Sequence, residues 1–170
     1  LHRFIGNLLD MTRLESGAMQ PNASLHFPGD IVGSALRRAS RLLARHKLDV
    51  ALPADLPMLR VDAVLFEQVV FNLLDNAAKY GAGEISLRLL AAPGEIHIEV
   101  GDCGPGIPES EIDRLKRPFT RLEAARTNAT GTGLGLAIVD RIARLHDGQL
   151  DLLPNPGGGL LVRLTLPIRR

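Results

Sequence analysis

Residues 62–81 read DAVLFEQVVFNLLDNAAKYG, and this stretch is the most informative about the fold. At about 100 degrees per residue the apolar side chains share one face of a helix, which we expect from Asp62 to Tyr80. A second face is polar and carries Gln68, Asn72, Asn76 and Lys79. Asparagine is a poor helix former, so propensity does not explain two of them one turn apart. The stripe is either a solvent-facing surface or a ligand site, because amide oxygens suit Mg²⁺ and lysine suits phosphate.

The chain that follows carries a carboxylate at the end of an apolar strand. Alternation predicts strands over 85–90 and 96–102, joined in a hairpin by the turn 92–95. Parity places Asp102 on the same face as the isoleucines and the valine of its strand. A carboxylate aimed at a core needs a hydrogen-bonding partner. Asp102 therefore either caps the Gly-Pro-Gly turn that follows it or accepts a hydrogen bond from a ligand amine, such as that of adenine.

A glycine-rich segment, Gly131-Thr132-Gly133-Leu134-Gly135-Leu136, opens a helix expected over 132–146. Free N–H groups and the positive end of the helix dipole favour an anion at such a position. The pattern is weak by itself, because no strand precedes it as in a Rossmann site and no P-loop lysine follows. The preceding residues 103–131 form a long, irregular stretch rich in Gly, Pro, Thr and Asn, which indicates a ligand lid.

The remaining elements predict a mixed sheet covered by three helices on one face. An amphipathic helix is expected over 1–19, and its apolar seam needs a partner helix. A further helix is expected over 30–46 with Asp30 as its N-cap, and Gly148 is the expected C-cap of the last helix. Short strands are expected at 25–27, 48–52, 58–61, 149–153 and 160–166.

Composition excludes several function classes. The 170 residues have a formal net charge of +1, which does not favour nucleic-acid binding, and one cysteine, which excludes an internal disulfide framework. No segment approaches the roughly 18 apolar residues of a membrane span, so we expect no membrane contact. The chain begins inside an amphipathic pattern without Met, so we expect a fragment of a longer protein. The basic residues between 37 and 47 are typical of a solvated helix face.

Four motifs in one order resemble the N, G1, F and G2 boxes of the sensor histidine kinase catalytic domain. They are Asn72–Tyr80, Asp102–Ile107, Arg117–Arg121 and Gly131–Leu136. The resemblance covers about residues 24–167, and residues 7–17 resemble the second helix of the family's dimerisation hairpin. It implies an α/β two-layer sandwich of the Bergerat ATP-binding type, with a mixed, mainly antiparallel sheet. The implied domains are a hairpin remnant at 1–20 and a catalytic ATP-binding domain at 21–170.

The resemblance also implies roles toward Mg²⁺ and the phosphates of ATP. Asn76 would ligate Mg²⁺, and Asn72 would support the metal or the phosphates. Lys79 would contact phosphate, and Arg121 and Arg126 would reach the phosphates from the lid. Asn72, Lys79 and Arg121 are the implied catalytic residues. The glycines of the last motif would form a hinge and a cradle for the triphosphate.

A second set of residues would hold the base and ribose. Tyr80 would lie against them, Asp102 would take the adenine amine, and Phe119 would anchor the lid. The glycines of the second motif would let backbone approach the ring. The implied ATP-binding residues are Asn72, Asn76, Lys79, Tyr80, Asp102, Gly104, Gly106, Ile107, Phe119, Arg121, Arg126, Gly131, Thr132, Gly133, Leu134, Gly135 and Leu136.

The implied reaction is transfer of the γ-phosphoryl group to a histidine of the hairpin and on to a response-regulator receiver domain. The implied setting is a homodimeric bacterial sensor protein anchored in the inner membrane, with this domain in the cytoplasm. None of His2, His26, His46, His97 or His146 has the sequence setting of the family's acceptor, so we expect ATP binding without autophosphorylation. Two alternatives are a clamp-type ATPase of the same superfamily and a degenerate nucleotide-binding scaffold. Asn72 disfavours the first, because that position is typically a glutamate in the ATPases and an amide cannot act as a base.

Overall fold

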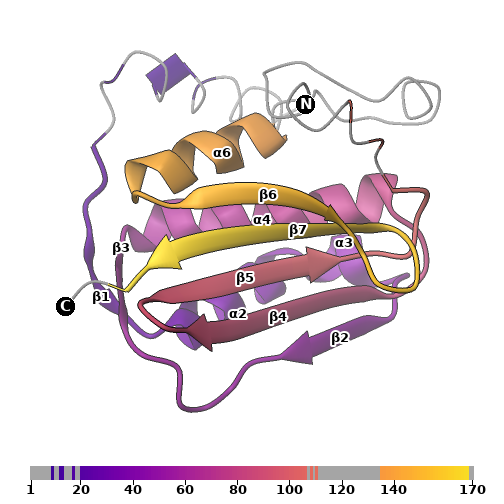
Figure 1. Cartoon of the computed structure of the whole chain (residues 1–170), viewed down its shortest axis with the longest axis horizontal. Helices are drawn as coiled ribbons and strands as arrows, with labels where there is room; N and C mark the ends of the chain where they lie inside the picture. The colour runs from indigo at the N-terminus through magenta and orange to yellow at the C-terminus, as the bar shows by residue number, and fades with distance from the viewer. Residues whose placement is uncertain are drawn as a thin grey trace.

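The computed structural model describes residues 9, 12–13, 17, 20–106, 108, 110 and 135–168. Its main sheet has five strands in the order β2-β4-β5-β7-β6 (Figure 1). β2 runs parallel to β4, and every other neighbouring pair is antiparallel. The strands are β2 (Leu48–Ala51), β4 (Ile85–Ala92), β5 (Glu95–Gly101), β6 (Gln149–Pro154) and β7 (Leu160–Pro167).

The described helices cover one face of this sheet, and the other face carries none of them (Figure 1). They are α2 (Pro28–Arg38), α3 (Ser40–Leu43), α4 (Ala63–Tyr80) and α6 (Gly135–Leu145). The core lies between the two layers, because β4, β5, β6 and β7 turn alternate aliphatic side chains toward the helices. Each fully buried aliphatic side chain contributes about 1.5–3 kcal/mol. The predicted two-layer α/β sandwich with a mixed, mainly antiparallel sheet is confirmed.

The sequence predicts a single mixed sheet, but the structure also has a second, two-stranded sheet. β1 (Ser24–His26) pairs antiparallel with β3 (Leu59–Val61). Asp62 follows β3 directly, and its carboxylate accepts hydrogen bonds from the backbone N–H groups of Val64 and Leu65, at 3.1 Å each. The small sheet therefore ends directly before the N-cap residue of α4.

The helix expected over 30–46 differs in two respects. Its N-cap is Phe27 and its first residue is Pro28, so the prediction of Asp30 as the N-cap is wrong and Asp30 lies in the first turn. Proline suits the first helical position, where a missing N–H costs no hydrogen bond. The helix also breaks at Ala39, which has φ −88° and ψ 3°, so that α2 and α3 are separate.

The end of α6 also departs from expectation. Asp147 takes the left-handed conformation with φ 58°, a role that the sequence analysis gave to Gly148. Aspartate tolerates this region better than most residues. Gly148 still takes part in the cap, because its N–H donates to the Ala143 carbonyl oxygen at 2.7 Å. A Cβ built on it would also lie 2.5 Å from the carbonyl oxygen of Thr165 in β7. No helix among the described residues is long and apolar enough to cross a membrane.

Several predictions fall wholly or partly on residues that the structure does not describe. Of the helix expected over 1–19, only residues 9, 12, 13 and 17 are described, and of the irregular stretch 103–131 only residues 103–106, 108 and 110. The helix at 132–146 is described from Gly135 onward. The division into parts at 1–20 and 21–170 therefore stays a prediction.

Candidate functional site

The polar face of α4 is not a plain solvated surface. Asn72 is only 3% exposed, and its Oδ1 accepts a hydrogen bond of 2.9 Å from Nε2 of Gln68. The Asn72 Nδ2 atom is buried and has no hydrogen-bond partner within the described part of the chain. Most buried polar atoms in proteins are satisfied, so an orphan of this kind calls for an explanation. For Asn72, the interpretation as a solvent-facing residue is wrong.

The second asparagine of α4 lies against the start of α6. A Cβ built on Gly135 would lie 3.2 Å from the Asn76 Oδ1 atom, which is a tight contact, so glycine favours this close approach of the two helices. The first and last predicted motifs therefore meet in space at Asn76 and Gly135. Leu136, the next residue, packs half-buried against the core.

The donor set at this point fits Mg²⁺ held mainly by a ligand. The described residues contain no cluster of three or more His, Cys, Asp or Glu side chains that could hold a metal ion. Magnesium commonly keeps its waters and binds through few protein oxygens together with substrate phosphates. One amide oxygen, that of Asn76, next to the helix N-terminus is consistent with that mode.

Lys79 forms an ion pair with Asp75, one turn earlier on α4. The Nζ and Oδ2 atoms are 3.1 Å apart, and the two side chains are 22% and 12% exposed. An ammonium group has three N–H donors, so the pair leaves capacity for a phosphate oxygen. The pair fixes the direction of a side chain that would otherwise be free to rotate.

Asp102, at the end of β5, is 7% exposed and is held by backbone groups. Its Oδ1 accepts hydrogen bonds from the N–H of Gly104 at 2.7 Å and, more weakly, of Leu160 at 3.4 Å. The predicted capping of the turn is therefore confirmed. No hydrogen bond within the described ranges uses Oδ2, so that oxygen remains available to a ligand amine.

The connection between β6 and β7 holds the backbone of Asp102 through hydrogen bonds. Asn155 Nδ2 donates to the Asp102 carbonyl oxygen at 2.7 Å, and the Asp102 N–H donates to Leu160 O at 3.0 Å. Gly159 has φ 93°, and a Cβ there would lie 2.0 Å from the Asp102 carbonyl oxygen. Sequence reasoning interpreted this segment only as a strand connection. The signal it missed was a run of three glycines, which often marks a close approach of two backbones.

The end of α4 also touches Asp102. A Cβ built on Gly81 would lie 2.7 Å from the Cβ and Cγ atoms of Asp102. The structure therefore brings together Asn76, Gly135, Asp102 and Gly104 at one end of the sandwich, from motifs far apart in sequence. Gly106 belongs to the same turn as Gly104 and has φ 76°.

Other predicted site residues lie outside what the structure describes. Tyr80 ends α4, and its side chain is not described. The residues beyond the described ranges are Ile107, Phe119, Arg121, Arg126, Gly131, Thr132, Gly133 and Leu134. Their roles stay predictions.

Arg38 is a neighbour of the site that sequence reasoning missed. Its guanidinium lies 4.2 Å from the ring centroid of Phe71, and its Nη1 donates to Gln68 Oε1 at 3.2 Å. Arg38 is exposed, in line with the interpretation of the basic residues as a solvated face, but it also contacts α4. No sequence pattern links positions 38 and 68, because the contact depends on how α2 packs on α4.

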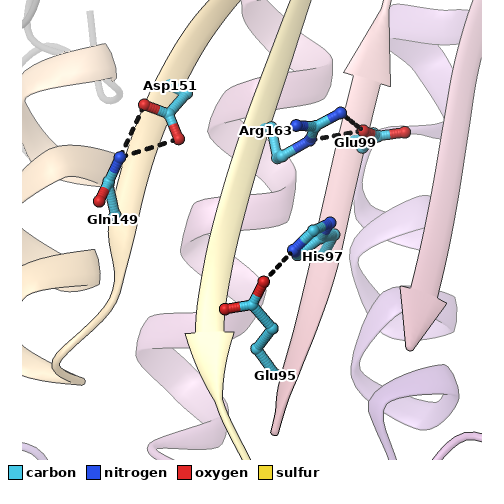
Figure 2. Close-up of polar contacts among 6 residues, drawn as sticks. All are labelled: Glu95, His97, Glu99, Gln149, Asp151 and Arg163. Atoms are coloured by element: carbon cyan, nitrogen blue, oxygen red, sulfur yellow. Dashed lines mark hydrogen bonds and ion pairs between the residues drawn. The ribbon is translucent and has the colours of Figure 1, made fainter. Parts of the chain in front are cut away.

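The open face of the sheet is a separate, self-paired surface (Figure 2). Arg163 donates from Nε to Oε2 of Glu99 at 2.7 Å, and its Nη2 lies 2.7 Å from the same oxygen in an ion pair. His97 pairs with Glu95 at 2.7 Å. His97 lies on the outer face as the alternation predicts. His146 lies elsewhere, with Nε2 accepting from the Asp62 N–H at 3.0 Å, which supports its predicted structural role.

These features define a class. A two-layer sandwich in which an asparagine-bearing helix meets a buried aspartate and the start of another helix is a Bergerat-type ATP-binding domain. Residues 61–170 match the model of the histidine kinase-, DNA gyrase B- and HSP90-like ATPase family, and the chain belongs to that family.

Several curated relatives are named as sensor proteins. The chain is 32% identical over 170 residues to the sensor protein KdpD of Clostridium acetobutylicum, covering 98% of this chain and 19% of that protein. It is 35% identical over 167 residues to KdpD of Escherichia coli K12, covering 97% and 18%. The chain thus spans about a fifth of the length of these relatives.

Solved structures of sensor histidine kinases are similar to this chain in fold. The mycobacterial sensor histidine kinase MprB has a TM-score of 0.74 at 27% identity, covering 86% of this chain and 98% of that one. Full-length ShkA in complex with AMPPNP has a TM-score of 0.83 at 24% identity, covering 96% and 35%, and supports the fold alone. The resemblance to sensor histidine kinase catalytic domains is confirmed.

Proposed function

We propose that this chain binds ATP with Mg²⁺ and, within a longer sensor kinase, transfers the γ-phosphoryl group to a histidine on a dimerisation hairpin. The phosphoryl group would then pass to an aspartate of a response-regulator receiver domain. Support comes from the family and from relatives that are sensor proteins. The observation that carries the proposal is the unequal use of the two Asp102 oxygens.

Asp102 is arranged to read adenine. Oδ1 is occupied by backbone N–H groups, so the carboxylate cannot rotate freely, and Oδ2 stays available as an acceptor. The exocyclic amine of adenine donates a hydrogen bond, whereas guanine presents a carbonyl oxygen at the same place. A fixed carboxylate oxygen therefore accepts from adenine and repels guanine.

The phosphates would lie toward α4 and the start of α6. Asn76 Oδ1 is placed where it could meet a metal–phosphate group, and Lys79 adds a positive charge on the same helix. Bound Mg²⁺ would neutralise charge on the phosphates, as in other phosphoryl transfers. The residues of this chain would bind and orient, since phosphoryl transfer asks little covalent chemistry of the protein.

Hydrolysis in place of transfer is disfavoured by Asn72. Its side chain is a buried amide, and an amide cannot take a proton from water. A clamp-type ATPase would need a base that activates water near the γ-phosphate. The chain should therefore hold ATP without consuming it quickly when no acceptor histidine is present.

Calorimetric titration with AMPPNP and with GTP, each with and without Mg²⁺, tests the proposal. We expect binding of AMPPNP, a stronger affinity with Mg²⁺ and much weaker binding of GTP. The Asn76→Ala variant should lose the Mg²⁺ dependence and keep adenine selectivity. With a hairpin supplied in trans, phosphohistidine should form from ATP. Absence of AMPPNP binding by the wild type would sink the proposal.

A further inference from the structure

We propose that Arg38 is a positioning residue, which turns the Asn72 amide so that its NH₂ group, and not its oxygen, faces the phosphates of the nucleotide. The inference rests on the proposed ATP binding. It adds a residue from a neighbouring helix to the site, and it makes Asn72 a donor to phosphate in place of a metal ligand.

The argument begins with the chemistry of the three side chains. A guanidinium group can only donate hydrogen bonds, so Arg38 Nη1 requires the oxygen end of the Gln68 amide, at 3.2 Å. The NH₂ end of Gln68 then points to Asn72 and donates to Oδ1 at 2.9 Å. Asn72 consequently keeps its own NH₂ end for something else.

Without Arg38, the orientation of the Gln68 and Asn72 amide groups would not be determined. The two ends of a carboxamide have the same shape, so a Gln–Asn pair can exchange donor and acceptor by turning both groups. Arg38 removes that freedom because its guanidinium can donate only to the oxygen end of the Gln68 amide. The direction of the Asn72 amide is thus decided on α2, 34 residues away in sequence.

Arg38 is itself held in place. Its guanidinium stacks over the ring of Phe71 at 4.2 Å, and Phe71 is only 6% exposed, so the ring forms a rigid base. Arg38 remains exposed, and a cation–π contact of this kind restricts its side chain without burying it. The stack and the hydrogen bond to Gln68 together keep one N–H aimed along α4.

The free end of Asn72 is suited to an anion. Nδ2 is buried and unpartnered among the described residues, and a buried donor without an acceptor is unfavourable. Asn72 lies one turn before Asn76 and on the same helix face, so a ligand at Asn76 is within reach of it. A phosphate oxygen accepts a hydrogen bond from NH₂, whereas a metal ion has no attraction for that group. Asn76 remains the residue suited to Mg²⁺.

The first test is Asn72→Asp, with AMPPNP affinity measured with and without Mg²⁺. The aspartate would still accept from Gln68 but would present an oxygen to the phosphates. If Asn72 donates to phosphate, affinity falls about tenfold or more in both conditions, as for loss of one hydrogen bond to a charged group. If affinity falls without Mg²⁺ but is restored or raised with it, Asn72 is a metal ligand and the proposal is overturned.

The second test examines the positioning role of Arg38. Arg38→Met should lower AMPPNP affinity about twofold while leaving adenosine affinity unchanged, because half of the Asn72 amides would then turn the wrong way. Arg37→Met, with the same charge change one residue away on α2, is the matched control and should retain affinity. Arg38→Lys, which keeps a donor, should restore part of the loss.

Gln68→Glu extends the test by forcing the reversed arrangement. A glutamate accepts from both neighbours, so Asn72 must turn its NH₂ toward residue 68. We expect a loss of about tenfold or more in AMPPNP affinity that persists at high salt, where long-range repulsion by the new charge is screened. Equal behaviour of Arg38→Met and Arg37→Met, or equal losses for adenosine and AMPPNP, would overturn the proposal while the proposed function stands. Wild-type protein that binds no AMPPNP would overturn both.

Discussion

Strand β5 carries Glu99 and is followed directly by Asp102, and each of these two carboxylates is 7% exposed. Glu99 points to the open face of the sheet, where Arg163 donates from Nε to Oε2 at 2.7 Å and its Nη2 lies 2.7 Å from the same oxygen in an ion pair (Figure 2). Asp102 points to the helix side, and among the described residues it receives only neutral backbone N–H groups. Although they are three residues apart in the chain, the two acids meet different surroundings.

The surroundings of Glu99 neutralise it. In the strand register Arg88 and Arg163 lie on either side of Glu99, and Asp151 follows beyond Arg163, so charges alternate across four strands. Opposite charges placed directly across from each other stabilise a sheet. A carboxylate that is paired with cations has little remaining capacity to accept hydrogen bonds from a ligand.

The surroundings of Asp102 hold it without neutralising it. Within the described part of the chain no cation pairs with Asp102, and its backbone is fixed by the loop between β6 and β7. Backbone N–H groups orient the carboxylate through one oxygen and leave the other to accept. The difference teaches that burial alone does not separate a structural acid from a binding one, whereas the nature of its donors does.

The largest expected effect is on stability, from a substitution at the close contact between the β6–β7 loop and the Asp102 backbone. Gly159→Ala should destabilise the fold by about 3–4 kcal/mol, because the φ of 93° is strained for alanine and the new Cβ would meet the Asp102 carbonyl oxygen. Urea unfolding measures the loss. Gly157→Ala is the control, since its φ is 88° with nothing within 4 Å, and should cost only about 1–2 kcal/mol. Equal losses would mean that the close approach contributes nothing.

The next effect falls on binding. Asp102→Asn should keep the bond from Gly104 to Oδ1 but place an NH₂ group against the adenine amine. This change should weaken AMPPNP binding by about 2–3 kcal/mol, or roughly 30- to 150-fold. Calorimetry measures this change. The free energy of unfolding should change by less than about 1 kcal/mol, because the backbone contacts remain. An unchanged affinity would contradict the role of Oδ2.

The reverse behaviour is expected of Glu99. Glu99→Gln should lower the free energy of unfolding by about 1–2 kcal/mol, between the values for exposed and buried ion pairs, since Arg163 is 34% exposed. AMPPNP affinity should not change. A double-mutant cycle with Arg163→Met isolates the pair. Weaker nucleotide binding by Glu99→Gln would break the comparison between the two acids.

The smallest effect concerns the side chain that holds the Asp102 backbone. Asn155→Ala removes the 2.7 Å bond to the Asp102 carbonyl and should cost about 1 kcal/mol of stability. A two- to threefold loss of AMPPNP affinity should accompany it as Asp102 becomes less well placed. On the open face, Gln149 Nε2 donates to Oδ1 and Oδ2 of Asp151 at 2.9 and 3.1 Å (Figure 2), and Gln149→Ala, which removes these bonds, should leave affinity unchanged. The same result for both variants would argue against a role of the loop in binding.

Much of the fold was predictable because it follows from local periodicity. The polar and apolar faces of α4, the hairpin of β4 and β5, and the position of Asp102 on the core side of its strand all follow from spacing. The errors lay at helix ends. Asp30 was a plausible cap by composition, but Pro28 started the helix earlier, and Asp147 took a conformation expected of glycine.

By itself, the sequence determined the class of fold, the order of the motifs and the residue types that can bind ATP, since these depend on neighbours within a few turns or strands. Only the tertiary structure decided which atoms of those residues are available. Asn155 reaches Asp102 across 53 residues, and Arg38 reaches Gln68 across 30. Such contacts depend on how whole elements pack, and packing sums many weak interactions along the entire chain that no single stretch of sequence records.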